Sequence, residues 1–120
     1  MRAISMFAVL MLGTCLSAAE TKGTATKITG WVLDSACAYT KGLTKPISRE
    51  CAISCAKKGS PLVLLRDDGT IFLPISEEMP AEGQNERLMP FAGKRVTVNG
   101  RTFARAGSQA VVIDKIEEAK

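Results

Sequence analysis

Apolar and polar residues alternate along several short stretches of this chain, and each stretch predicts a β-strand. Within residues 27–35, Ile28 and Val32 fall on one face. Trp31 and Leu33 fall on the opposite face. Because β-branched and aromatic side chains at a period of two suit a pleated, half-buried surface, this stretch predicts the first strand of a sheet.

A β-hairpin is predicted in residues 61–76, where two apolar runs flank the dipeptide Asp68-Gly69. Asp-Gly between apolar runs is a strong signal for a tight turn between antiparallel strands. The next segment, residues 77–90, is polar and acidic. We expect it to be a long loop with a helical turn around residues 85–89.

Two further strands are predicted near the C-terminus, within residues 91–107 and 110–118. Asn99-Gly100 in the first of them is either the turn of a tight hairpin or a glycine bulge in one long, bent strand. Because residues 105–109 supply another turn just before the last strand, we expect the bulge.

A short helix is predicted to begin at Arg49 and to end near Gly59. The hydroxyl of Ser48 can accept an early backbone N–H, and a glycine can end a helix in the left-handed conformation. Four small residues form one stripe of this helix and are expected to face the interior: Cys51, Ala52, Cys55 and Ala56. The preceding residues, 37–46, are expected to be a loop.

The order of these elements is one strand, a loop with a helix, a hairpin, a long loop and two more strands. Five short strands with a single helix and many turns indicate a small closed sheet. We therefore expect a mainly β fold with one short helix, arranged as a five-stranded antiparallel OB-like barrel.

The N-terminus has the pattern of a secretory signal peptide. Arg2 precedes an apolar run, residues 3–12, which is too short to span a bilayer but suits the apolar region of a signal. Small residues follow, so we expect cleavage before Glu20. Two alternatives remain open: a lipid anchor attached at Cys15, or an uncleaved anchor.

This pattern divides the chain into a signal peptide of residues 1–19, a flexible leader of residues 20–27 and one barrel domain of residues 28–118. All three interpretations of the N-terminus export the domain, so it is expected to be periplasmic or secreted, and less readily a lipoprotein. The mature chain would then have no transmembrane span.

Composition narrows the classes of function. The formal net charge is only +4 and the basic residues are scattered, so a nucleic-acid partner is not expected. The chain has no histidine, which removes the commonest general base and the commonest zinc ligand. The partner is expected to be an unknown ligand or another envelope protein.

Three cysteines remain once Cys15 is removed or lipidated, and they carry the candidate chemistry. In an oxidising compartment, a disulfide from Cys37 to Cys51 or to Cys55 would close a short loop and contribute about 3 kcal/mol. Alternatively, three thiolates converging from a loop and one helix face would bind Cu(I) or Zn²⁺, with Asp34 or a water as a fourth ligand.

The order of motifs resembles that of a loosely defined family of small exported bacterial domains of unknown function. The similarity rests on GWVLDSAC at residues 30–37, on the C-x-x-x-C helix with its following hairpin, and on GKRVTVNG at residues 93–100. The resemblance implies an OB-fold-like barrel and an exported location, and it brings no settled activity. Relatives often carry a histidine near the first cysteine, and this chain has none.

The sequence therefore predicts an exported, non-enzymatic binding or accessory module that is stabilised by a disulfide. The first alternative is a soft-metal protein that binds Cu(I) or Zn²⁺ through Cys37, Cys51 and Cys55. The second alternative is a thiol redox protein, although C-x-x-x-C is not the C-x-x-C spacing of common thiol oxidoreductases. No catalytic residue and no organic cofactor is predicted.

Overall fold

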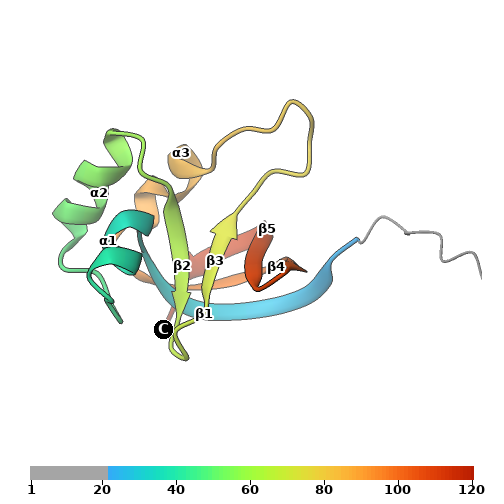
Figure 1. The fold of residues 1–120 in the computed structure, drawn as a ribbon, viewed down its shortest axis with the longest axis horizontal. Helices are drawn as coiled ribbons and strands as arrows, with labels where there is room; N and C mark the ends of the chain where they lie inside the picture. The colour runs from blue at the N-terminus through green and yellow to red at the C-terminus, as the bar shows by residue number, and fades with distance from the viewer. Residues whose placement is uncertain (1–21) are drawn as a thin grey trace, which may run out of the picture.

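The computed structural model describes residues 22–120. The predicted signal peptide and Cys15 lie outside the described residues. The described chain forms a closed barrel of five strands in the order β1-β2-β3-β5-β4 (Figure 1). The predicted class is confirmed: the protein is mainly β, with a five-stranded closed barrel. No helix within residues 22–120 is long and apolar enough to cross a membrane.

Strand β1 (Thr24–Asp34) is central to the closure, because it pairs with two partners. Its second half pairs antiparallel with β2 (Leu62–Arg66), and its first half pairs antiparallel with β4 (Arg95–Arg105). The strand begins inside residues 20–27, which were expected to be a flexible leader. Pairing with the far half of β4 orders residues 24–27, so the barrel is longer than the alternation alone indicated.

The expectation of a purely antiparallel barrel is wrong at one position. Strand β3 (Ile71–Pro74) pairs antiparallel with β2 but parallel with β5 (Ser108–Glu118). The reason is geometric: directions cannot alternate all the way around a closed ring of five strands, so one neighbouring pair must be parallel. The sheet is therefore mixed.

The bulge expected at Asn99-Gly100 is confirmed. β4 runs through this dipeptide without a turn, and the register with β5 shifts between the two residues. A Cβ atom on Gly100 would lie only 2.2 Å from the carbonyl oxygen of Val112. The bend thus brings two backbones so close that only glycine fits.

The interior of the barrel is aliphatic. Every strand contributes buried side chains: Ile28, Val32, Leu62, Leu64, Phe72, Val96, Val98, Val111 and Ile113. A second, smaller cluster lies around Leu33, Val63 and Leu65, and includes the buried Ala38. Because successive strand residues point to opposite faces, this second cluster covers the outside of the same strands.

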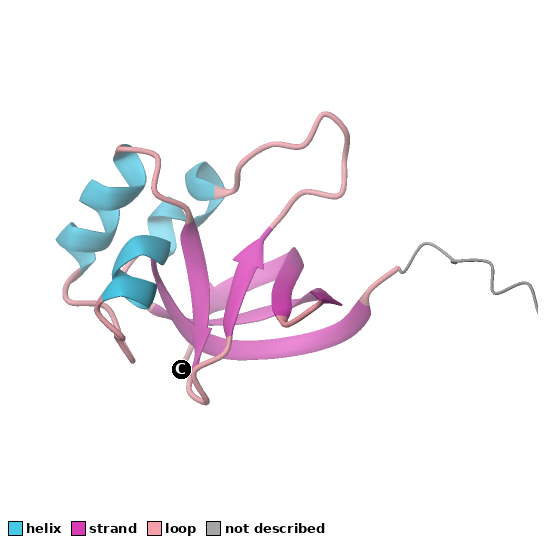
Figure 2. Ribbon diagram, viewed as in Figure 1, coloured by secondary structure: helices cyan, strands magenta, loops and turns pink. Residues whose placement is uncertain are grey.

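Two helices lie between β1 and β2, beside the barrel (Figure 2). Helix α2 (Arg49–Lys57) is the predicted one, and its predicted N-cap is confirmed by the hydrogen bond from the Cys51 N–H to Ser48 Oγ, 3.0 Å. Helix α1 (Ser35–Thr40) lies where a loop was expected. Its signal was local: Asp34 Oδ2 accepts the N–H of Cys37 at 3.0 Å and caps the first turn.

The connection between β3 and β4 carries the helical turn expected near residues 85–89. It consists of α3 (Asn85–Leu88) followed by the short 3₁₀ helix η1 (Met89–Phe91). The protein thus has more helices than the single one expected. Leu88 is fully buried in the barrel cluster together with Ala52 and Ala56 of α2, so both connections pack against the same core.

Candidate metal centre

The three cysteines of the described chain come together between α1 and α2. Their Sγ atoms all lie within 4.8 Å of one another, and each side chain is half-buried. Cys37 comes from α1, whereas Cys51 and Cys55 come from α2. The convergence expected from the sequence is therefore present in the structure, and it joins residues as far as eighteen positions apart in the chain.

The caps of the two helices set the positions of these thiols. Asp34 ends β1 and begins α1, which holds Cys37 in the first turn. Ser48 begins α2 and holds Cys51 in its first turn in the same way. Cys55 follows one helical turn later, on the same face as Cys51. Each thiol is thus fixed by backbone hydrogen bonds rather than by a flexible loop.

Small side chains allow α2 to lie close to the barrel. Ala52 and Ala56, next to the two helical cysteines, are buried in the core. The alanines therefore take the innermost positions, and the cysteines lie beside them, turned toward α1. Sequence reasoning placed all four residues in one inward stripe and did not separate these two directions.

Asp34 is the only buried charged residue among residues 22–120, with an exposed fraction of 2 %. Its hydrogen bond and its negative charge act on the thiols. The pKa of Cys37 is raised to about 11, first by desolvation and then by Asp34, against a smaller opposite effect of Lys41. Desolvation and then the charge of Asp34 also raise the pKa of Cys55.

The arrangement can hold one thiophilic ion. In a tetrahedral zinc site with Zn–S bonds of about 2.3 Å, the sulfurs stand about 3.8 Å apart. The Sγ atoms lie up to 4.8 Å apart, which is about 1 Å more than this separation. Small rotations of the cysteine side chains would close the difference. Asp34 does not belong to the converging group, since only the three cysteines meet the mutual limit. Metal binding by Cys37, Cys51 and Cys55 remains a prediction, and the structure adds that their Sγ atoms lie within 4.8 Å of one another.

The structure does not show the disulfide expected between Cys37 and the helix, since all three described cysteines are free thiols in it. A bond would need its two sulfurs about 2.05 Å apart. The proximity that the disulfide prediction required is there, but the covalent link is not shown.

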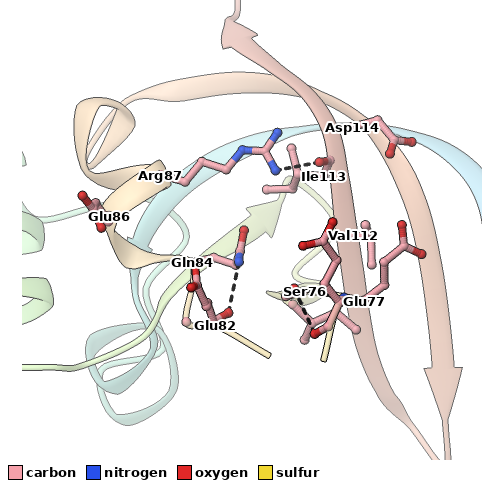
Figure 3. Close-up of a pocket in the computed structure, with 12 residues that line it drawn as sticks. Ser76, Glu77, Glu82, Gln84, Glu86, Arg87, Val112, Ile113 and Asp114 are labelled. Carbon is pink, nitrogen blue, oxygen red and sulfur yellow. Dashed lines mark hydrogen bonds between the residues drawn. The ribbon is translucent and has the colours of Figure 1, made fainter. Parts of the chain in front are cut away.

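A pocket of about 550 Å³ lies apart from the thiol cluster, between the loop after β3 and strand β5 (Figure 3). Glutamate side chains surround it, but Arg101 pairs with Glu77 at 2.7 Å and with Asp114 at 3.3 Å. Arg87 spans the upper part of the pocket and donates to the carbonyl oxygen of Ile113 at 2.7 Å.

These carboxylates do not form a cation site in the described structure. Residues 22–120 contain one group of three or more potential ligands that converge, and that group is the three cysteines. The ion pair of Glu77 with Arg101 fixes the loop to β4, and the hydrogen bond from Arg87 to Ile113 fixes it to β5. The thiol cluster is therefore the better candidate for chemistry.

Comparisons with known protein families, with curated proteins and with solved structures found no match.

Proposed function

We propose that this protein binds a single thiophilic ion, such as Cu(I) or Zn²⁺, through the thiolates of Cys37, Cys51 and Cys55. It acts as a non-enzymatic binding protein outside the cytoplasmic membrane, where the N-terminal pattern would deliver it. The observation that carries the proposal is the mutual approach of three free Sγ atoms within 4.8 Å.

The chemistry of the donors supports a soft or borderline ion. Thiolates select Cu(I) and Zn²⁺ over hard cations such as Mg²⁺ or Ca²⁺, which take oxygen ligands. Three protein ligands leave a fourth tetrahedral position for water or an exogenous ligand, or they complete a trigonal site. A site with a free position suits uptake and release better than permanent structural binding.

A disulfide-stabilised module remains the second candidate, because the same proximity favours it. Oxidation of Cys37 with either helical cysteine would tie α1 to α2 and leave one thiol. The two functions exclude each other in one molecule at one time, since a disulfide removes two of the three donors. A thiol redox activity would need the same pair to cycle, and the raised pKa of Cys37 and Cys55 makes these thiols poor nucleophiles.

Metal titration of the reduced, full-length chain tests the proposal. We expect one Zn²⁺ or Cu(I) per chain and simultaneous protection of three thiols from alkylation. Replacement of Cys37, Cys51 or Cys55 by serine should weaken binding by more than about 100-fold, because loss of a direct ligand exceeds the effects of outer-shell changes.

Cys15→Ser is the matched control, since it removes a cysteine other than the three proposed ligands, and we expect it to leave the affinity unchanged. Circular dichroism of each variant separates loss of the ion from loss of the fold. If the protein recovered from its native envelope carries one free thiol and a Cys37 disulfide, the ion-binding proposal is wrong and the disulfide-stabilised module takes its place.

A further inference from the structure

Among residues 22–120, the thiol cluster has three donors and no fourth. Within residues 22–120, no carboxylate meets the mutual distance limit that the three sulfurs satisfy, and the chain has no histidine. All three donors come from the facing sides of α1 and α2. Such a set suits an ion whose coordination is filled by three ligands on one side. An ion that carries a lone pair in the fourth direction has this preference.

The charge of the occupied site separates the candidate ions. Three thiolates leave a net charge of minus two around Cu(I), minus one around Zn²⁺ and zero around a trivalent ion. Asp34, the buried charged residue of the described chain, accepts the N–H of Cys37 at 3.0 Å and so lies next to the cluster. Because an anionic complex beside a buried carboxylate costs free energy, the neutral complex is favoured.

We propose that this cluster takes up a trivalent metalloid hydroxide, arsenite or antimonite, with Cys37, Cys51 and Cys55 as its three ligands. The inference rests on the proposed function and names the class of ion. One As(OH)₃ reacts with three thiols to give one As(SR)₃ and three waters. Three As–O bonds and three S–H bonds break, while three As–S bonds and three O–H bonds form.

This condensation involves no oxidation or reduction, and it needs no external proton acceptor. Each thiol proton leaves on a hydroxide that the metalloid brings with it. Binding of Zn²⁺ or Cu(I) must instead release thiol protons to the solvent, which makes their affinity depend on pH. The condensation therefore needs no charged species to form inside the half-buried cluster.

Sodium arsenite and the reduced, full-length chain provide the test. We expect native mass spectrometry to show a gain of one arsenic atom and a loss of three hydrogen atoms. Alkylation should find all three thiols protected. Calorimetry in buffers of different ionisation enthalpy should detect no proton release with arsenite and a clear release with Zn²⁺. X-ray absorption should find three sulfur neighbours and no oxygen.

Matched variants decide whether the three thiols act together. Each of Cys37→Ser, Cys51→Ser and Cys55→Ser should weaken arsenite binding by at least about tenfold, whereas Cys15→Ser should not change it. Asp34→Asn should leave the arsenite affinity within about threefold and strengthen that for Cu(I), because it removes a negative charge next to the anionic complex only. Weakening of both would overturn the charge argument for a neutral complex, because Asp34 would then act only as the cap of α1.

The possible results separate this inference from the function on which it rests. If Zn²⁺ or Cu(I) protects three thiols and arsenite protects none, the metalloid inference is overturned and the proposed function stands. If arsenite binds through two thiols with one oxygen retained, the three-ligand site is also overturned. If no ion binds to the correctly folded, reduced chain, both proposals fail together.

Discussion

The two long connections of this barrel, residues 35–61 and residues 75–94, differ in what they do with charge. The first carries five basic residues and one acidic residue, and none of its cations is in an ion pair among the described residues. The second carries four glutamates, of which Glu77 is bound to Arg101 by two hydrogen bonds of 2.7 Å.

The difference extends to the thiols. All three described cysteines lie in the first connection, together with two exposed apolar side chains, Tyr39 and Ile47. The second connection contributes Leu88 to the core and ties itself to β4 and β5 through arginines. The second connection is thus fastened to the sheet through arginines, whereas the first presents three soft donors and cations that form no ion pair among the described residues. We infer that the barrel is the scaffold and that residues 35–61 carry the function.

The two connections meet at the start of α2. Arg49 donates to the carbonyl oxygens of Pro90 at 3.2 Å and Ala92 at 2.7 Å. Gly93 lies against the same residue, and a Cβ atom there would stand 2.4 Å from Arg49 Cα. A substitution at Gly93 therefore makes it possible to disturb the first connection through the second.

The largest loss of stability is expected from a substitution in the barrel core, against which both connections pack. Leu64 is fully buried in the barrel, so Leu64→Ala should lower the free energy of unfolding by about 2 to 5 kcal/mol. Chemical denaturation followed by circular dichroism measures this loss. If thiol reactivity and circular dichroism report the same midpoint, residues 35–61 unfold with the barrel as one unit. Separate midpoints would show that residues 35–61 unfold independently.

Gly93→Ala should have the next largest effect, about 2 to 4 kcal/mol, because φ is +75° and the new Cβ would meet the backbone of Arg49. The strain can be relieved only if the start of α2 moves. We therefore also expect weaker Zn²⁺ binding by the folded variant. Gly107→Ala is the control, since its φ is also positive but its added Cβ meets nothing within 4 Å. Equal losses of stability in both variants would contradict the contact argument.

Alkaline pH should lower the folding stability of the metal-free, reduced protein, because the Cys37 thiol loses its proton. The folded-state pKa of Cys37 is raised from 9.0 to about 11, so the folded state keeps a proton that the unfolded chain has lost. This contribution is complete below about pH 9 and is lost as the pH rises toward about 11. Comparison with Cys37→Ser isolates it from the titration of lysines and Tyr39. Identical pH profiles for the two proteins would refute it.

The smallest effect is expected at the ion pairs of the second connection. Arg101→Gln removes partners of Glu77 and Asp114, yet these carboxylates are more than half exposed. We expect a loss of stability of at most about 1 kcal/mol, decreasing with added salt, and no change in ion binding by the thiols. A marked loss of Zn²⁺ affinity would show that the second connection also supports the site.

Much of the site was accessible from the sequence because its signals are local. Ser48 and Gly59 bound α2, and the spacing of Cys51 and Cys55 places both on one face. Helix α1 was missed, although Asp34 is a good N-cap residue, because six residues followed closely by Gly42 resemble a turn as much as a helix. The burial of Asp34 beside the thiols could not be predicted from the sequence, since it depends on the elements that pack against it in the folded structure.

The sequence by itself determined the five strands, the Asp68-Gly69 turn, the bulge at Gly100 and the caps of α2, since each depends on residues within a few positions of one another. Only the tertiary structure decided the parallel pairing of β3 with β5 and the approach of Cys37 to the other two thiols. Both depend on how the ring of strands closes. Packing against that closed barrel is what brings α1 and α2, and with them three sulfur atoms, to one place.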